Sequence, residues 1–271
     1  MNKIISRTMI VPNIHLLTVE SPLVASKIKA GHFVIIKVDE TGERIPLTVA
    51  DWDREMRTVS CVFMQVGRST RKLALLKNGD EVSTFVGPLG KIMDIHHFGT
   101  VACVGGCYGI GSIYPVVRSM KEAENRVISF IEARSRFLLY REDKIGQISD
   151  ELVVSTGDGS KGRKGHNSDG LRAMLEKGRS IDLVVAIGCT FMMHMISETT
   201  RPFGVKTIVS LNPIMVDGTG MCGACRVEVG GKTKFACVDG PNFDGHEVDW
   251  NLLLSRRKVY NRQEMISEKA D

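Results

Sequence analysis

The chain has 271 residues, which is long enough for two domains and a small further module. Hydrophobic residues make up 43%, charged residues 25%, and the formal net charge is a mild +5. Basic residues are dispersed and aromatic residues reach only 6%, so no nucleic-acid partner is expected. No apolar run is long enough to span a bilayer, and the N-terminus lacks a signal-peptide pattern. We therefore expect a cytoplasmic protein with no membrane partner.

Residues 1–97 consist of short β segments separated by turns. Candidate strands are Lys3–Ile10, Ile14–Ser21, His32–Val38, Arg44–Asp51, Thr58–Val66 and Glu81–Phe85, with one helix at Ser69–Leu76. Short strands at this spacing are typical of a closed antiparallel barrel.

Residues 98–210 alternate between apolar strands and helices. The expected strands are Thr100–Gly105, Asn125–Ile131, Glu151–Ser155, Ile181–Ile187 and Val205–Ser210. The expected helices are Ile113–Glu124, Phe137–Asp143, Leu171–Lys177 and Thr190–Thr199. This alternation predicts an α/β domain with a doubly wound parallel sheet. Residues 211–271 break the alternation and form a third segment.

A glycine-rich turn, from Gly105 to Gly111, follows the first strand of the α/β domain and opens a helix. Such a turn lets backbone N–H groups approach a pyrophosphate, although the strict G-x-G-x-x-G pattern is absent and a purely structural turn is the alternative. The next strand ends in Glu132-Ala-Arg134-Ser135-Arg136. A carboxylate there suits a ribose diol, whereas Arg and Ser suit a 2′-phosphate, so these residues leave NAD and NADP both open.

Two later loops end strands of the same sheet. Gly157-Asp158-Gly159 follows one strand, and Gly188-Cys189 follows another and leads to Met192. Ligands bind at this edge of doubly wound sheets. Ordinary turn chemistry is the alternative for the first loop, and a structural role is the alternative for Cys189.

Two segments of the expected barrel indicate a flavin-binding site. Arg44-Ile-Pro46-Leu47-Thr48 offers a guanidinium for a phosphate and a hydroxyl for the flavin ring. Gly67-Arg68-Ser69-Thr70 enters a short helix, whose N-terminus attracts anions. A surface arginine and an N-cap serine or threonine are the simpler alternatives.

The third segment carries Asp217-Gly-Thr-Gly-Met-Cys222-Gly-Ala-Cys225 and then Cys237. The plant-type two-iron cluster uses the same spacing, with cysteine at the first position. Glycines 218, 220 and 223 supply positive φ angles and N–H groups for such a loop. A tetrahedral zinc site is the alternative. Disulfides are disfavoured, because the chain has an odd number of cysteines, seven.

These motifs, in this order, resemble the ferredoxin–NADP reductase superfamily, and within it the electron-transfer subunits related to that of dihydroorotate dehydrogenase. Aspartate at the first cluster position is similar to the small subunits of NADH-dependent reduced ferredoxin:NADP oxidoreductases. Those enzymes are electron-bifurcating transhydrogenases, and similar chains are also named sulfide dehydrogenase β subunits.

The resemblance implies three sets of binding residues and no catalytic residue. FAD would be bound by Arg44, Pro46, Leu47, Thr48, Met64, Val66, Gly67, Ser69 and Thr70. NAD(H), or NADP(H), would be bound by Gly105, Gly106, Gly109, Gly111, Glu132, Arg134, Ser135, Gly157, Asp158, Gly159, Cys189 and Met192. A [2Fe-2S] cluster would be held by Asp217, Cys222, Cys225 and Cys237.

The implied activity is that of an oxidoreductase subunit passing electrons between NAD(H), FAD and the cluster. A larger flavin- and iron–sulfur-containing partner of the glutamate-synthase-like type would hold the sites for ferredoxin and NADP. The alternatives are an electron-transfer subunit of a dihydroorotate or sulfide dehydrogenase, a stand-alone flavin reductase, and a zinc-stabilised nucleotide-sensing module.

Overall fold

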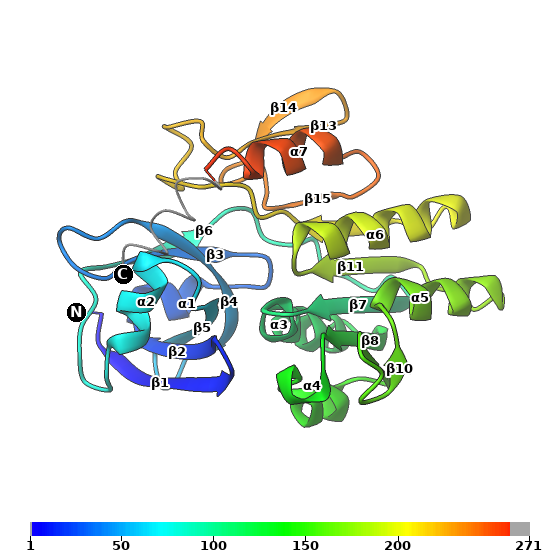
Figure 1. Cartoon of the computed structure of the whole chain (residues 1–271), viewed down its shortest axis with the longest axis horizontal. Helices are drawn as coiled ribbons and strands as arrows, with labels where there is room; N and C mark the ends of the chain where they lie inside the picture. Colours follow the sequence, from blue (N-terminus) through cyan, green and yellow to red (C-terminus); the bar gives the residue numbers. More distant parts are fainter. Residues whose placement is uncertain (1, 261–271) are drawn as a thin grey trace. The chain divides into compact units, whose positions relative to one another are not determined.

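The computed structural model describes residues 2–260, which form two compact units (Figure 1). Among the described residues, unit 1 combines residues 2–92 with Asn212–Pro241 and residues 249–260. Unit 2 comprises Met93–Leu211 and Asn242–Val248. The last part of the expected third segment, residues 261–271, lies outside the described residues.

Unit 1 is built on a six-stranded antiparallel sheet with the order β1-β2-β5-β4-β3-β6. The strands are β1 (Ile4–Val11), β2 (Ile14–Glu20), β3 (Phe33–Lys37), β4 (Ile45–Asp53), β5 (Thr58–Met64) and β6 (Thr84–Leu89). A bridge between Lys3 and Glu81, with a hydrogen bond from the N–H of Ile4 to the carbonyl of Asp80, joins β1 to the segment before β6. The two edges are thereby linked, which confirms the expected barrel.

The barrel core consists of the inward residues of these strands, which alternate with outward polar residues. Fully buried members include Ile4, Leu17, Ile36, Val59 and Leu73. Leu73 comes from α2 (Arg68–Leu75), close to its expected position. The short helix α1 (Pro22–Lys27) was not expected, and it forms because Pro22 suits a first turn while Val24 and Ala25 face the core. The expected strand at Glu81–Phe85 instead begins at Thr84, because residues 79–82 bond to the edge of β1.

The rest of unit 1 is a small module. A loop over residues 212–225 leads into a hairpin of β13 (Arg226–Val229) and β14 (Lys232–Phe235). Helix α7 (Trp250–Arg257) packs on β13 and buries Trp250 and Leu253. Asp249 caps this helix by accepting a hydrogen bond from the N–H of Leu252 at 2.8 Å.

Unit 2 contains a seven-stranded sheet with the order β10-β9-β8-β7-β11-β12-β15. Its strands are β7 (Thr100–Gly106), β8 (Arg126–Ala133), β9 (Glu151–Thr156), β10 (Arg163–Lys164), β11 (Leu183–Ile187), β12 (Thr207–Ser210) and β15 (Asn242–Asp244). All neighbours pair in parallel except β12 and β15. The doubly wound sheet is confirmed, with an antiparallel strand added at one edge.

The four helices of unit 2 cover both faces of its sheet. Helices α3 (Gly109–Glu122) and α4 (Glu142–Ile148) lie on one face, and α5 (Asn167–Glu176) and α6 (Thr190–Thr200) lie on the other (Figure 1). The expected helix at Phe137–Asp143 is wrong. A short 3-10 turn spans Arg136–Leu138, and α4 begins only after Arg141, whose φ is 56°. The Tyr140 side chain is buried against the glycine-rich turn and holds this stretch outside a helix.

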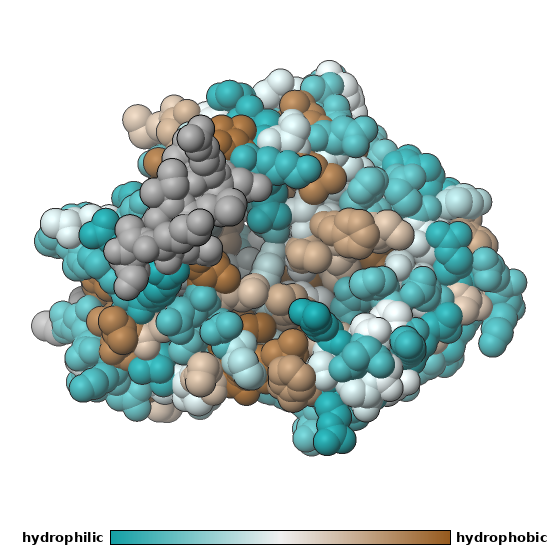
Figure 2. Space-filling view, viewed as in Figure 1, coloured by the Kyte–Doolittle hydropathy of each residue, from teal (hydrophilic) through white to brown (hydrophobic). Residues whose placement is uncertain are grey.

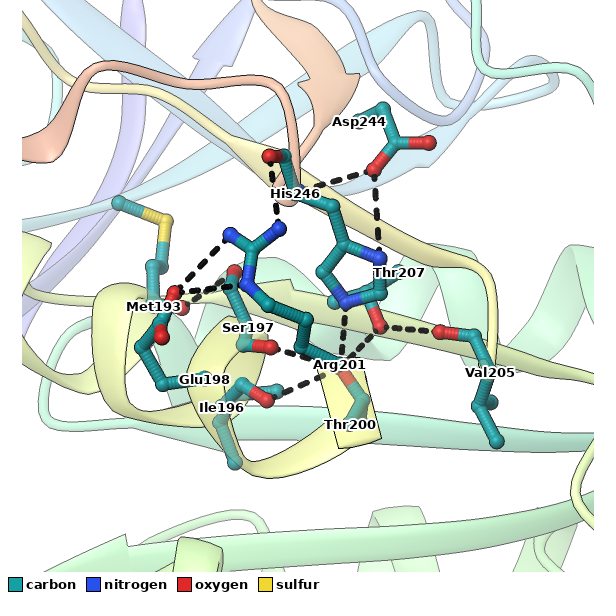
Figure 3. A network of polar contacts seen from close by, with 10 residues as sticks. All are labelled: Met193, Ile196, Ser197, Glu198, Thr200, Arg201, Val205, Thr207, Asp244 and His246. Carbon is teal, nitrogen blue, oxygen red and sulfur yellow. Dashed lines mark hydrogen bonds and ion pairs between the residues drawn. The ribbon is translucent and has the colours of Figure 1, made fainter. Parts of the chain in front are cut away.

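The strand β15 is held to the rest of unit 2 by a polar network around the buried residues Thr200 and Thr207 (Figure 3). The Nε2 of His246 lies 2.9 Å from the Oγ1 of Thr200, which lies 2.6 Å from the Oγ1 of Thr207. Arg201 donates to the carbonyl of His246 at 3.1 Å, and Asp244 accepts from the N–H of His246 at 2.9 Å. Because Thr200 is fully buried, its hydroxyl cannot reach a substrate, and this Thr–His–Asp arrangement has a structural role. We call these contacts of Thr200, Thr207, His246 and Asp244 the clasp.

No helix among residues 2–260 is long and apolar enough to cross a membrane. The face drawn in Figure 2 is largely hydrophilic, with apolar side chains in separate groups. Exposed apolar side chains also occur in the loop over residues 212–225, called the cysteine loop below, where Val216 and Met221 are 55% and 88% exposed, and after Cys237, where Val238 is 45% exposed.

Candidate functional site

The expected flavin residues come from two chain segments that the barrel brings together. β4 pairs antiparallel with β5 through Val49 and Cys61, so residues 44–48 at the start of β4 lie beside residues 64–70 after β5. Pro46, Leu47 and Thr48 lie on β4, Met64 ends β5, and Gly67 precedes α2.

The turn before α2 is shaped by its own side chains. The Oγ1 of Thr70 accepts hydrogen bonds from the N–H groups of Val66 and Gly67, both at 3.0 Å. The hydroxyl of Ser69 donates to Glu43 at 2.6 Å. These bonds fix the backbone at the N-terminus of α2, where a helix favours anions.

Arg44 has a buried Nε atom without a hydrogen-bond partner among the described residues. Its Nη2 donates to the backbone carbonyl of Asp217 at 3.4 Å. An unpaired buried donor of a charged group destabilises a protein, so this atom indicates that a ligand acceptor belongs beside Arg44.

The cysteine loop has the backbone that its glycines predict. Gly218, Gly220 and Gly223 have φ angles of 83°, 91° and 67°. A Cβ atom on Gly220 would lie 2.5 Å from Val238, so this position also needs glycine for space.

The sulfur atoms of Cys225 and Cys237 are buried and lie 3.2 Å apart, far longer than a disulfide bond. Burial, with Cys225 as a neighbour, raises the pKa of the Cys237 thiol to about 12. Cys222 is exposed, and the N–H groups of Ala224 and Asp217 hold the pKa of its thiol below the usual range. Two buried thiols so close together become thiolates only when a cation joins them, which fits a metal or cluster.

Asp217 points its carboxylate into its own loop. Its Oδ2 accepts hydrogen bonds from the N–H of Thr219 at 2.9 Å, from the Thr219 hydroxyl, and from the N–H of Met221 at 3.4 Å. The Thr219 side chain and N–H hold the pKa of this carboxyl below its usual range. Within residues 2–260, no three His, Cys, Asp or Glu side chains are arranged to hold a metal ion. The structure therefore brings Cys225 and Cys237 together but does not bring Cys222 and Asp217 into one ligand set with them, while the adjacent thiols and the glycine loop fit the chemistry of a cluster.

The glycine-rich turn lies at the point where the strand order of unit 2 reverses. β7 pairs with β8 on one side and β11 on the other, and ligands bind at such switch points. A Cβ atom on Gly109 would lie 1.9 Å from the carbonyl oxygen of Ile187. Only glycine therefore lets α3 start against the end of β11. Met192 packs against the glycine-rich turn, because a Cβ atom on Gly106 would lie 2.6 Å from its sulfur.

Two tyrosines that sequence reasoning missed fix the turn. The hydroxyl of Tyr108 donates to the carbonyl of Gly188 at 2.7 Å and so joins the loops after β7 and β11. The hydroxyl of Tyr140 accepts from the N–H of Gly111 at 3.0 Å and lies 3.0 Å from the carbonyl of Tyr108. The tyrosine inside the glycine run was the only sequence signal for this arrangement.

Two cysteines follow the same neighbouring strands. Cys189 is exposed and caps α6, where its sulfur accepts from the N–H of Met192 at 3.4 Å. Cys107 is half-buried with a φ of 55°, and burial raises the pKa of its thiol.

Glu132, Ser135 and Asp158 all lie at the carboxyl edge of the sheet, as expected. Glu132 is turned inward, however, and its Oε2 accepts from the N–H of Asn167, a buried residue that sequence reasoning missed. The N–H of Asp158 donates to the carbonyl of Arg134 at 3.1 Å, which joins the loops after β8 and β9.

Comparison with known proteins identifies the family. Residues 212–249 match the iron–sulfur cluster binding domain of dihydroorotate dehydrogenase B. A Thermotoga maritima protein, named dihydroorotate dehydrogenase B (NAD(+)), electron transfer subunit homolog, is 45% identical over 98% of this chain and 94% of its own length. The chain belongs to this family of electron transfer subunits and their homologues.

Other relatives refine the similarity. The electron transfer subunit of dihydroorotate dehydrogenase B from Clostridium perfringens is 29% identical over 83% of this chain and 89% of its own length. A chain in a solved structure of NADH-dependent reduced ferredoxin-NADP oxidoreductase is 44% identical, with a TM-score of 0.94 over 100% of this chain and 97% of that chain. The fold is shared by a ferredoxin NADP+ reductase from Neisseria gonorrhoeae. That protein is 14% identical, with a TM-score of 0.58, and the match covers 75% of this chain and 90% of that chain.

These findings confirm the reductase-superfamily fold and the iron–sulfur segment. The chain is an oxidoreductase electron-transfer subunit. The match to an iron–sulfur domain over the cysteine loop favours a cluster over the zinc alternative.

Proposed function

We propose that the chain is the NAD(H)-oxidising arm of an NADH-dependent reduced ferredoxin:NADP oxidoreductase. We call residues 44–48 and 64–70 the flavin patch. The observation that carries the proposal is Arg44 in this patch, whose buried Nε has no hydrogen-bond partner among the described residues and whose Nη2 contacts the cysteine loop. When bound, FAD supplies two-electron exchange with NAD(H), and the [2Fe-2S] cluster supplies single-electron transfer. The 44% identity to a chain of the bifurcating enzyme supports this choice over a dihydroorotate dehydrogenase, because the Clostridium perfringens dihydroorotate dehydrogenase B subunit matches at 29% and the Thermotoga maritima protein at 45% is named only as a homolog of such subunits.

The residues of the chain have distinct tasks in this proposal. Arg44 and the N-terminus of α2 bind the anionic part of FAD, because both present N–H groups to it. The amides of the loop over residues 216–224 stabilise thiolates and sulfide, as the lowered pKa of Cys222 indicates. The switch-point glycines let the pyrophosphate of NAD(H) approach the start of α3.

The cluster ligands in this proposal are Cys222, Cys225, Cys237 and the free carboxylate oxygen of Asp217. A carboxylate is a harder ligand than a thiolate. A cluster with Asp217 as a ligand should therefore differ in reduction potential from a cluster held by four cysteines. The partner would be a larger flavin- and iron–sulfur-containing subunit of the glutamate-synthase-like type, which binds ferredoxin and NADP(H).

Anaerobic rapid mixing of the purified chain with NADH tests the proposal. We expect bleaching of flavin absorbance followed by the EPR signal of a reduced two-iron cluster. Protein that contains zinc and no flavin would support the nucleotide-sensing alternative instead. The complex isolated from its native cells should couple NADPH, NAD⁺ and ferredoxin, whereas coupling of dihydroorotate oxidation to NAD⁺ would assign it to the other enzyme.

A further inference from the structure

Glu132, the carboxylate that the sequence offers for the adenosine ribose, is engaged elsewhere. Its Oε2 accepts from the N–H of Asn167 at the start of α5, and its Oε1 lies 3.8 Å from Nδ1 of His166. The Glu132 side chain is only 14% exposed. This carboxylate therefore anchors α5, and it has little surface left for a ribose.

A second carboxylate stands at the same edge, one strand further along. Asp158 is exposed and follows β9, and its N–H donates to the carbonyl of Arg134 at 3.1 Å. The N–H of Gly157 similarly donates to the carbonyl of Ala133 at 3.1 Å. These two bonds fasten the loop of Asp158 to the loop after β8, the strand beyond which a doubly wound sheet places the adenosine ribose.

The serines around Asp158 orient it. Its Oδ1 accepts from the N–H of Ser160 at 2.9 Å. The Oγ of Ser160 accepts from the N–H of Arg136 at 2.8 Å and lies 3.3 Å from the Oγ of Ser135. Hydrogen bonds from Ser160 and Ser135 hold the pKa of Asp158 at about 2, so this carboxylate is ionised throughout the physiological range.

The charges around Asp158 make its own charge important for the choice between a ribose diol and a 2′-phosphate. The exposed side chains of Arg134 and Arg136 flank it on the neighbouring loop and would attract a 2′-phosphate. An ionised carboxylate accepts hydrogen bonds from the two hydroxyls of a ribose diol but repels a phosphate.

We propose that Asp158, rather than Glu132, is the residue that selects NAD(H) over NADP(H). This inference rests on the proposed function, because it concerns the nucleotide site of that same activity. Removing the charge of Asp158 would leave two arginines at the ribose and so admit NADP(H).

The test compares wild type with Asp158→Asn, Asp158→Ser and Glu132→Gln in the flavin-loaded chain. Calorimetric titration with ADP-ribose and with 2′-phospho-ADP-ribose measures binding without the nicotinamide. Ferricyanide reduction with NADH and with NADPH measures turnover. We expect wild type to favour the unphosphorylated ligand, and both Asp158 variants to shift the ratio of the two affinities at least tenfold towards the 2′-phosphorylated ligand. Glu176→Gln, which removes an exposed charge at the end of α5, is the charge control and should leave the ratio unchanged.

Three outcomes distinguish a role of Asp158 from a role of Glu132 and from failure of the proposed function. An unchanged ratio in both Asp158 variants would overturn the inference while leaving the proposed function intact. A ratio that changes in Glu132→Gln but not in Asp158→Asn would return selection to Glu132. Wild-type protein that binds neither ligand would overturn the proposed function, and the inference with it.

Discussion

The guanidinium of Arg44 and the backbone carbonyl of Asp217 are joined by a hydrogen bond of 3.4 Å. Arg44 precedes β4 in the proposed flavin patch, and Asp217 lies in the cysteine loop, so the bond connects two motifs that lie far apart in the sequence. Gly218 reinforces this contact, because a Cβ atom there would lie 2.9 Å from Ile35 of β3. Unit 1 therefore places the proposed flavin patch next to the cysteine loop.

Replacing Arg44 by alanine should release FAD. A charged hydrogen bond contributes about 1.5–3 kcal/mol, so the affinity for FAD should fall about tenfold to a hundredfold. Flavin per chain after gel filtration measures the effect. Arg54→Ala is a matched control, because Arg54 also donates one long bond, at 3.5 Å, to a backbone carbonyl of the barrel. Equal flavin content in the two variants would contradict the role of Arg44.

Asp217→Cys should retain a cluster and change its EPR spectrum and reduction potential, because a soft thiolate replaces a hard oxygen. Asp94→Cys introduces a thiol at an exposed position outside unit 1 and serves as the control. An unchanged spectrum in Asp217→Cys would remove Asp217 from the ligand set.

Gly109→Ala should disrupt the nucleotide site, because the new Cβ atom would meet the carbonyl oxygen of Ile187 at 1.9 Å. We expect lost binding of ADP-ribose and a destabilisation above about 3 kcal/mol. Gly146→Ala is the control, since a Cβ atom there meets only Leu152 at 3.4 Å and alanine favours the helix α4. If both variants bind ADP-ribose like wild type, the close packing of α3 against β11 is not required.

Thr200→Val should loosen the clasp of Figure 3, because it removes the hydroxyl between His246 and Thr207. Leaving buried polar groups unpaired costs about 1–3 kcal/mol, and each kcal/mol lowers the melting temperature by about 2–4 °C in a protein of this size. Thr233→Val in the exposed hairpin strand β14 is the matched control. A melting temperature equal to that of the control would show that the clasp does not stabilise unit 2.

Glu132 should make stability depend on pH. Burial raises its pKa in the folded state above the ordinary value of 4.5, although the Asn167 N–H and His166 oppose this. The folded state therefore holds the proton more tightly, and this contribution is lost as the pH rises through the raised pKa. Between pH 5 and pH 8, the free energy of unfolding should fall more in wild type than in Glu132→Gln. Urea titration measures it, with Glu176→Gln as the exposed control, and equal slopes would contradict the shift.

Sequence patterns predicted the elements whose signals are local. The strand–helix alternation gave the doubly wound sheet, and the positive φ angles at Gly218, Gly220 and Gly223 followed from a loop that glycines alone allow. The spacing of short strands in residues 1–97 likewise predicted the barrel, whose core is formed by the buried residues of those strands.

What the sequence could not show depends on contacts between distant residues. The inward turn of Glu132 is set by the N–H of Asn167, and the stretch before α4 is set by Tyr140. The return of residues 242–248 to unit 2 depends on Thr200 and His246, which carry no recognisable motif. Such tertiary hydrogen bonds override local preference, so periodicity cannot reveal them.

The most direct test of the electron-relay account is a combined assay of flavin, iron and acid-labile sulfide in one sample of anaerobically purified protein, together with its absorption spectrum. The account predicts one FAD with two irons and two sulfides per chain. Protein that contains zinc and neither flavin nor sulfide would contradict it.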